Sequence, residues 1–445
     1  MTDTIVAIAT AGGIGSIAIV RLSGPASVTL ARRVAPGASF HPRQADLTSL
    51  YDQNNALIDQ GIVLYFQSPR SFTGEEIVEF QCHGGQIIAQ EILTTLMQHG
   101  ARLAEPGEFS KRAFLNGKID LSKAEAIAKM IEAQSTDAAR ILARQLKGEL
   151  GTFVEEIRSN LLRALAHSEV MIDYAEEIPD DILDGLILQL QALSDRMKRI
   201  IESSHRRRGI LEGFRVAIIG KPNVGKSSLL NALLDNNRAI VSDIAGTTRD
   251  TIEEPVRIGS HLIRLIDTAG IRHSSDTIEQ IGVERSLLSI AEADVIIALF
   301  DGSRPFDQED ARILELLEHF PDTEQFIALN KSDLPRAIDT KHFMAISPIE
   351  ISAVHHFVHL IEVLKKHLDA RGEGEEILLI SARQIDAVEK TKHAIEEALP
   401  PLQQGELELF SYHLQEAVKH IASITSPYDN DEILDQMFGE FCLGK

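Results

Sequence analysis

Hydrophobic and polar residues alternate in short runs along the first quarter of the chain, and turn residues separate these runs. The alternating runs are residues 5–8, 16–22, 61–65 and 76–80, and one run with helical spacing covers residues 86–98. A period of two predicts half-buried strands, whereas a period of 3.6 predicts a helix. We therefore expect residues 1–117 to form an α+β domain.

From about residue 118 the pattern changes to that of helices. Apolar residues recur at three- and four-residue spacing over residues 125–130, 138–150, 153–172 and 182–201. Strand-like apolar runs return within residues 212–370, and a segment rich in Gly and Glu follows from Arg371. Helical spacing then resumes. The economical arrangement is a multidomain α/β protein in which residues 212–370 are inserted into one helical domain, made of residues 118–211 and 371–445.

One strand-like run of the inserted domain leads into a glycine-rich loop. Residues 214–219 precede the sequence Gly-Lys-Pro-Asn-Val-Gly-Lys-Ser at 220–227, and a helical run follows. This strand–loop–helix context predicts a phosphate-binding loop. Backbone N–H groups and the helix N-terminus would face the anion, Lys226 would reach the β- and γ-phosphates, and the Ser227 hydroxyl would bind Mg²⁺. The expected nucleotide contacts are Asn223, Val224, Gly225, Lys226, Ser227 and Ser228.

A second motif indicates which base is bound. Asn330, Lys331, Ser332 and Asp333 follow the apolar run 326–329. The Asp333 carboxylate can accept hydrogen bonds from N1–H and the 2-amino group of guanine. Adenine lacks this pair of donors and would leave the carboxylate unpaired, which is costly. A closing serine motif is either Ser347-Pro348, which follows a strand-like run, or Ser352-Ala353, which keeps a backbone N–H that Pro348 lacks; both remain open.

Two polar segments lie between these motifs. The segment Asp267, Thr268, Ala269 and Gly270 ends the strand-like run 261–266, so that Asp267 can hold the magnesium shell and the Gly270 N–H can contact a γ-phosphate. A loop after the first helix holds a threonine pair that would complete the shell; its expected contacts are Ser242, Asp243, Ile244, Ala245, Gly246, Thr247 and Thr248. The four motifs in this order predict a GTPase domain with a mostly parallel sheet.

Two residues depart from the site of Ras-type GTPases. Ile271 stands where those enzymes carry a water-orienting glutamine, so another group must orient the attacking water. Asn223 lies inside the phosphate-binding loop, where its side-chain oxygen could hold a monovalent cation that replaces the charge of an arginine finger. A hydrogen bond that only stabilises the loop is an equal alternative for Asn223.

Motifs in all parts of the chain resemble the MnmE (TrmE) family of tRNA-modification GTPases. The resemblance rests on residues 3–7, 21–24, 73–76, 83–85 and 106–118, on the motifs above with residues 243–250, and on the ending Phe-Cys-Leu-Gly-Lys at 441–445. It implies a GTPase that, with a flavin (FAD)-dependent partner of the MnmG kind, modifies C5 of the wobble uridine (position 34) of certain tRNAs. The carbon would come from a 5-formyl- or methylene-tetrahydrofolate. The first domain would bind the folate and form a homodimer.

The resemblance also implies roles for single residues. The folate contacts would be Arg21, Glu79, Lys118 and Lys445, and Cys442 is a possible reactive thiol. Potassium would be held by Asn223, Thr247 and the carbonyls of Ser242 and Ile244, and Mg²⁺ by Ser227 and Thr248. Glu279 would orient water, with Arg249 as a second catalytic residue. Residues 9–16 lack the usual prolines and arginine of the family, which puts some N-terminal contacts in doubt.

Composition narrows these expectations. The 445 residues carry a formal net charge of −22, which argues against general affinity for nucleic acid, because such binding needs clustered cations. Two cysteines cannot form a disulfide framework. The chain shows no signal sequence and no apolar run of 18 residues, so we expect a cytoplasmic protein without membrane contact. A GTP-dependent ribosome-assembly switch is the alternative function, although it would not need residues 1–117 or the tail at 442–445.

Overall fold

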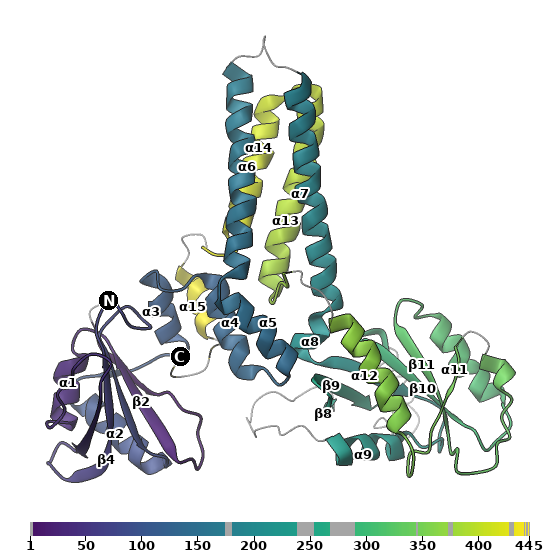
Figure 1. The fold of residues 1–445 in the computed structure, drawn as a ribbon, viewed down its shortest axis with the longest axis horizontal. Helices are drawn as coiled ribbons and strands as arrows, with labels where there is room; N and C mark the ends of the chain where they lie inside the picture. The colour runs from purple at the N-terminus through teal and green to yellow at the C-terminus, as the bar shows by residue number, and fades with distance from the viewer. Residues whose placement is uncertain are drawn as a thin grey trace, which may run out of the picture. The chain divides into compact units, whose positions relative to one another are not determined.

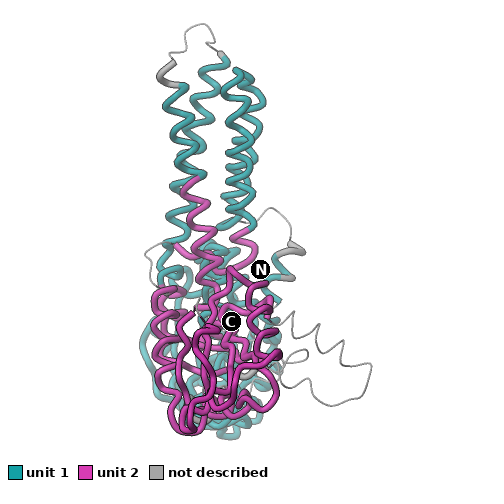
Figure 2. The backbone as a smooth tube through the Cα atoms, turned by 90° about the vertical axis from the view of Figure 1, so that its right-hand side faces the viewer, with its two compact units in different colours: residues 1–131, 144–194, 386–445 teal, residues 132–143, 195–385 magenta. Residues whose placement is uncertain are grey.

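The computed structural model describes most of the chain as two compact units. The described residues are 3–173, 180–237, 253–267, 290–343, 346–372, 377–426, 431–439, 441 and 444. Unit 1 contains residues 1–131, 144–194 and 386–445, and unit 2 contains residues 132–143 and 195–385 (Figure 2). This division reflects compactness, so the domain boundaries expected from the sequence stay a prediction. None of the described helices is long and apolar enough to cross a membrane.

Unit 1 begins with a six-stranded sheet whose strand order is β3-β4-β5-β2-β1-β6. The strands are β1 (Ile5–Ile8), β2 (Ile17–Ser23), β3 (Ala45–Tyr51), β4 (Leu57–Phe66), β5 (Ile77–His83) and β6 (Arg102–Leu103). All neighbours are antiparallel except β1 and β6. Helices α1 (Ser27–Val34) and α2 (Gln86–Gln98) share one apolar core with the sheet. The alternation noted in the sequence places Val20 and Leu22 in this core and leaves Arg21 between them on the other face.

The rest of unit 1 is helical. It contains α3 (Glu108–Leu115), α4 (Leu121–Glu132), α6 (Glu149–Asp173), α14 (Leu407–Ala422), α15 (Asp431–Gly439), and parts of α7 (Asp180–Arg206) and α13 (Ala382–Gln404). Helices α6, α7, α13 and α14 run alongside one another (Figure 1). Ser168 on α6 and Ser411 on α14 are joined by a 2.7 Å hydrogen bond between their hydroxyl groups. The two halves of the helical part, distant in sequence, therefore form one bundle.

The sequence pattern over residues 138–150 suggested one helix, but the chain turns there. Helix α5 (Thr136–Leu146) ends, and α6 begins at Glu149. Gly148 between them has a φ of 93°, a conformation that glycine adopts readily and that commonly ends helices. Apolar spacing persists across this break because both helices bury a face, which is why periodicity alone did not reveal it.

Unit 2 is built on a second six-stranded sheet, in the order β12-β11-β10-β7-β9-β8. The strands are β7 (Phe214–Ile219), β8 (Glu253–Ile258), β9 (His261–Asp267), β10 (Val295–Asp301), β11 (Glu324–Asn330) and β12 (Ile349–Glu350). Among the strands that the structure describes here, only β8 runs antiparallel to its neighbour. Its described helices include α8 (Arg208–Glu212), α9 (Lys226–Asn237), α11 (Gln308–Glu318), η1 (Thr340–Phe343) and α12 (Val358–Gly372). The mostly parallel sheet expected from the sequence is thus confirmed.

Successive residues of the central strands pack into two different cores. Val216 and Ile218 of β7 contribute to one apolar cluster, whereas Ala217 and Ile219 contribute to the other. A sheet covered on both faces is the usual setting of parallel strands. The carboxyl ends of β7, β9, β10 and β11 meet at one edge, which is where ligands bind in open α/β sheets.

Candidate functional site

The phosphate-binding loop lies at this edge, between β7 and α9, and its backbone leaves no room for side chains at two glycines. A Cβ atom at Gly220 would lie 2.4 Å from the carbonyl oxygen of Leu299. A Cβ atom at Gly225, where φ is 104°, would lie 2.2 Å from Nδ2 of Asn330. Asn223 has a φ of 64°, which asparagine tolerates better than most residues. Glycine is therefore required at 220 and 225, because Leu299 and Asn330 leave no space for a side chain there.

Asn330 joins three segments of the site. Its Nδ2 donates to the carbonyl oxygen of Val224 at 2.7 Å, and its Oδ1 accepts from the backbone N–H of Ala353 at 2.9 Å. The side chain is buried, so both ends of its amide are satisfied within the protein. The loop that follows β11 is thereby held against the phosphate-binding loop.

The neighbouring Asp333 stays exposed and ionised. A hydrogen bond from the Ser352 side chain is the main cause that lowers the pKa of this carboxyl. Ser352 and Ala353 therefore both lie beside the loop of Asn330 and Asp333, and the backbone N–H of Ser332 donates to the carbonyl oxygen of Ile351 at 3.0 Å. Of the two candidates for the closing serine motif, this geometry favours Ser352-Ala353 over Ser347-Pro348.

Lys226 and Ser227 open helix α9. The Lys226 ammonium donates to the carbonyl oxygens of Gly220 at 2.5 Å and Lys221 at 2.8 Å, so it lies curled over the loop. Ser227 is exposed in the first turn of the 12-residue helix. Asp267 ends β9 directly opposite Ile218 of the neighbouring β7, which places its backbone next to the start of the loop.

Two residues that the sequence analysis did not select also belong to this site. Asp301, at the end of β10, is buried and accepts from the Lys331 ammonium at 2.6 Å. Burial opposes its ionisation, but hydrogen bonds from Lys331 and Ser303 outweigh burial and lower the pKa of Asp301. Lys221, inside the phosphate-binding loop, pairs with Asp307 and Asp310. Asp301 could have been selected from the sequence, because it is an acidic residue at the end of an apolar run.

Many of the expected site residues lie outside the described part of the chain, and their roles stay predictions. They are Ser242, Asp243, Ile244, Ala245, Gly246, Thr247, Thr248, Arg249, Thr268, Ala269, Gly270, Glu279, Cys442 and Lys445.

In unit 1, the structure brings together two of the expected folate contacts. Arg21 on β2 and Glu79 on β5 are direct neighbours in the antiparallel register, and Arg21 Nε lies 2.7 Å from Glu79 Oε1. The Arg21 guanidinium also lies 5.7 Å from the ring centre of Phe109, and its Nη1 lies 3.5 Å from the carbonyl oxygen of Gly444. The tail of the chain therefore reaches the same strand. The Lys118 side chain lies beside Gly74.

A buried arginine supports this part of unit 1. Arg112 on α3 is fully buried and donates to Glu75 at 3.1 Å, to Glu108 at 2.9 Å and to Asp3 at 2.9 Å. Burying a guanidinium is costly unless carboxylates and hydrogen bonds satisfy it. Arg112 therefore ties together three segments that are separate in sequence.

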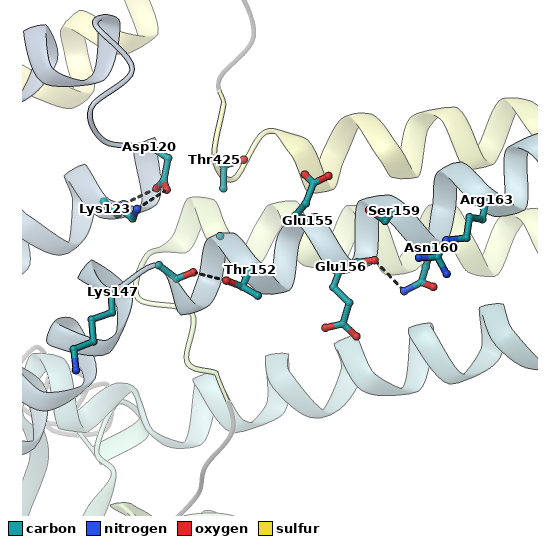
Figure 3. Close-up of a pocket in the computed structure, with 12 residues that line it drawn as sticks. Asp120, Lys123, Lys147, Thr152, Glu155, Glu156, Ser159, Asn160, Arg163 and Thr425 are labelled. Carbon is teal, nitrogen blue, oxygen red and sulfur yellow. Dashed lines mark hydrogen bonds and ion pairs between the residues drawn. The ribbon is translucent and has the colours of Figure 1, made fainter. Parts of the chain in front are cut away.

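A polar cavity of about 760 Å³ lies in the helical part of unit 1 (Figure 3). Helix α6 supplies most of its lining, together with residues near the start of α4 and Thr425. Three acidic residues and three basic residues share the lining, namely Asp120, Glu155, Glu156, Lys123, Lys147 and Arg163. Because neither sign of charge predominates, we assign no ligand to it.

Two protein-family models match the chain. The model of the MnmE helical domain matches residues 121–442, and that of the GTP-binding protein TrmE N-terminus matches residues 4–118. The chain belongs to the MnmE family. A relative from Sulfurovum sp. (strain NBC37-1), named tRNA modification GTPase MnmE, is 64% identical over 446 residues, which cover 100% of this chain and 99% of the relative. The resemblance seen in the motifs is thus confirmed.

Other comparisons extend this result. A relative from Aliarcobacter butzleri (strain RM4018), with the same name, is 56% identical over 444 residues, covering 100% of this chain and 99% of the relative. A solved structure of a variant of Aquifex aeolicus Era bound to GDP and aluminium fluoride is 28% identical and covers 40% of this chain and 66% of its own, with a TM-score of 0.28. The chain is thus a member of a family whose curated relatives are named tRNA modification GTPases.

Proposed function

We propose that this chain uses its GTP cycle to drive modification at C5 of wobble uridine 34 in certain tRNAs, giving products of the carboxymethylaminomethyl or aminomethyl type. It acts as a homodimer, in the cytoplasm, with an FAD-dependent partner of the MnmG kind, and a tetrahydrofolate derivative supplies one carbon. The names of the relatives support GTP hydrolysis linked to tRNA modification. The proposal that a folate supplies the carbon rests on the Arg21–Glu79 pair, which lies beside the backbone of Gly444.

The folate contacts follow from the chemistry of these side chains. Glu79 is suited to the amino–imino edge of a pterin, because a carboxylate can accept two parallel N–H bonds. Arg21, Lys118 and Lys445 are suited to the anionic glutamate end of the ligand. In the structure Oε1 of Glu79 accepts from Arg21, so folate binding would rearrange or share this pair.

The residues present also fit the magnesium ion that the family requires. Mg²⁺ prefers hard oxygen ligands and keeps several waters when it binds phosphates. Ser227 presents an exposed hydroxyl in the first turn of α9, and we propose Thr248 as the second protein ligand. Bound Mg²⁺ would neutralise charge on the β- and γ-phosphates. Lys226, now curled onto two loop carbonyls, would turn to the same phosphates.

Three further groups would complete hydrolysis. Asn223, Thr247 and the carbonyls of Ser242 and Ile244 would hold K⁺ against the phosphates, which supplies charge that other GTPases take from an arginine. Glu279 would orient the attacking water through a bridging water, because Ile271 has no polar group for this task. Arg249 is the second residue proposed to act during hydrolysis.

Nucleoside analysis of tRNA tests the proposed function directly. Mass spectrometry of digested tRNA from cells with and without this chain should show modified wobble uridine only when the chain is present. A Lys226→Ala variant should fail to restore it, because it lacks the ammonium that reaches the phosphates. Unchanged modification without the chain, accompanied by an excess of unassembled ribosomal subunits, would instead support the assembly-switch alternative.

A further inference from the structure

The second residue of the phosphate-binding loop is fastened to a helix at a distant place in the sequence. The ammonium of Lys221 lies 2.5 Å from Oδ2 of Asp307 and 2.8 Å from Oδ2 of Asp310. Only about 10% of the Lys221 side chain is exposed. Exposed ion pairs contribute little, but Lys221 and Asp310 are both sheltered, and Lys221 also engages the half-exposed carboxylate of Asp307.

The partner of Lys221 is itself a rigid structure. Asp307 is the N-cap of α11, where Oδ1 accepts from the backbone N–H groups of Glu309 and Asp310, while Asp310 accepts in return from the backbone N–H of Asp307 at 3.1 Å. This capping box fixes both carboxylates at the helix end. Asp310 is 2% exposed, so Lys221 provides the positive charge that this buried carboxylate needs.

The segment that contacts Lys221 also contacts the loop of residues 330–333, which is expected to bind guanine. Residues 302–307 connect β10 to α11, and Asp301 at the end of β10 accepts from Lys331 at 2.6 Å. In addition, the backbone N–H of Gly302 donates to the carbonyl oxygen of Asn330 at 2.8 Å. One connecting segment therefore carries contacts to the loops expected to bind the phosphates and the base.

Lys221 belongs to the backbone segment that is expected to surround the phosphates. Its own carbonyl oxygen accepts from the ammonium of Lys226, and the next residues lead to the N–H groups that face an anion. A backbone already held in the binding conformation loses less entropy when the ligand arrives. Releasing the Lys221 side chain would free the start of the loop, whereas Asn330 would still hold its end.

We propose that Lys221 is a positioning residue for nucleotide binding, which holds the phosphate-binding loop in its binding conformation through Asp307 and Asp310. In this role Lys221 does not contact the nucleotide. It raises the affinity for GDP and GTP and does not change the rate of the hydrolysis step. This role does not depend on which tRNA modification the GTP cycle drives.

The test measures GDP affinity and GTP hydrolysis with the full chain and Mg²⁺. Lys221→Met, which keeps the length of the side chain but loses its charge, should raise the Kd for GDP and the KM for GTP by roughly tenfold, on the scale of a charged hydrogen bond. The kcat at saturating GTP should change by less than about twofold. Lys221→Arg should restore most of the affinity, because it restores the charge. An unchanged KM in Lys221→Met would overturn the proposal.

A double-mutant cycle separates positioning from general destabilisation. Asp310→Asn keeps an oxygen for the N–H of Asp307 but weakens the pair with Lys221. If the two side chains act together, the double variant should bind GDP no more weakly than Lys221→Met alone. Additive losses would instead show independent effects and refute the coupling. Lys341→Met is the matched control, since Lys341 is 80% exposed in the same unit and should leave the Kd and KM unchanged.

Discussion

Asn330 and Val224 are joined across 106 residues of chain by a 2.7 Å hydrogen bond from the Asn330 amide to the Val224 carbonyl oxygen. The next residue of the loop, Gly225, lies so close to the same amide that a Cβ atom would be 2.2 Å from it. The loops expected to bind the base and the phosphates thus meet at one amide group. Each loop limits the residues that the other can carry.

Gly225→Ala should therefore damage nucleotide binding more than a loop substitution usually does. Alanine would clash with Asn330 and would also adopt a φ of 104°, which is costly for any residue with a Cβ atom. We expect GDP affinity to fall by at least about tenfold, as measured by fluorescence titration with a labelled nucleotide. Gly85→Ala is the matched control, because nothing lies within 4 Å of its Cβ position; equal effects of the two substitutions would contradict the steric argument.

Potassium dependence gives a test of Asn223. GTP hydrolysis should be faster in K⁺ than in Na⁺ at equal ionic strength, and Asn223→Gly should remove the difference. Glycine is the informative replacement because it accepts the φ of 64° found at this position, so that only the side-chain amide is lost. Alanine would add about 1–2 kcal/mol of backbone strain. Equal rates of the native protein in both salts would disprove the potassium assignment.

Asp294 and Asp301 should respond to pH in opposite directions. Burial, the largest cause, raises the pKa of Asp294, whose Oδ2 accepts from the backbone N–H of Arg215 at 2.8 Å. The folded state therefore holds the Asp294 proton more tightly than the unfolded state, and ionisation above the folded pKa lowers stability. Asp294→Asn, which keeps an acceptor oxygen, should raise the free energy of unfolding at pH 7, with the gain vanishing as pH falls towards 3.8.

Asp301→Asn is the matched comparison. Hydrogen bonds from Lys331 and Ser303 outweigh burial and lower the pKa of Asp301, so its ionised form stabilises the fold above pH 3.8, and this stabilisation is lost as pH falls through the lower folded pKa. The variant should be less stable at pH 7, and its deficit should shrink in acid. Chemical unfolding at pH 7 and at about pH 3, below the unfolded pKa of 3.8, measures both effects. A loss of stability in both variants at pH 7 would contradict the assignment for Asp294.

The tail of the chain should matter for folate but not for GTP. Deleting residues 442–445 removes the Gly444 carbonyl that lies 3.5 Å from Arg21, and also Lys445. Calorimetry should show that 5-formyl-tetrahydrofolate binds the intact protein and binds the truncated protein more weakly, while GTP hydrolysis is unchanged. No binding by the intact protein would reject the folate proposal. Cys442→Ser asks a separate question: full tRNA modification in cells would show that the thiol has no chemical role.

The local spacing of apolar and polar residues was sufficient to predict the nucleotide-binding motifs and to distinguish the α+β, helical and α/β parts of the chain. The phosphate-binding loop could be found because its glycines and Lys226 follow one another between a buried strand and a helix. The apolar run at 214–219 was sufficient to predict a strand before the loop, but not that both faces of β7 are covered. The pairing of Arg21 with Glu79 was not foreseeable from spacing, because it depends on the register of β2 against β5.

Contacts between distant segments account for what the sequence did not show. Lys221 and Asp310 are 89 residues apart, and nothing local to either residue indicates the other. The choice between Ser347 and Ser352 also needed tertiary structure, since it rests on the contacts of Ala353 with Asn330 and of Ser352 with Asp333. The end of α5 was missed for the opposite reason, because apolar spacing continues through Gly148 and conceals a local change in φ.

The buried position of Arg112 sets an order of events during synthesis. Its guanidinium binds both the carbonyl oxygen and the carboxylate of Asp3, a residue made 109 positions earlier. Ribosomes add roughly 5–20 residues per second, so the first strand waits on the order of 5 to 20 seconds for this partner. β1 gains its parallel neighbour β6 only when residues 102–103 have been made, and Asp3 gains its contact with Arg112 about ten residues later. Nascent chains that stop before residue 112 should therefore remain sensitive to protease at their N-terminal end.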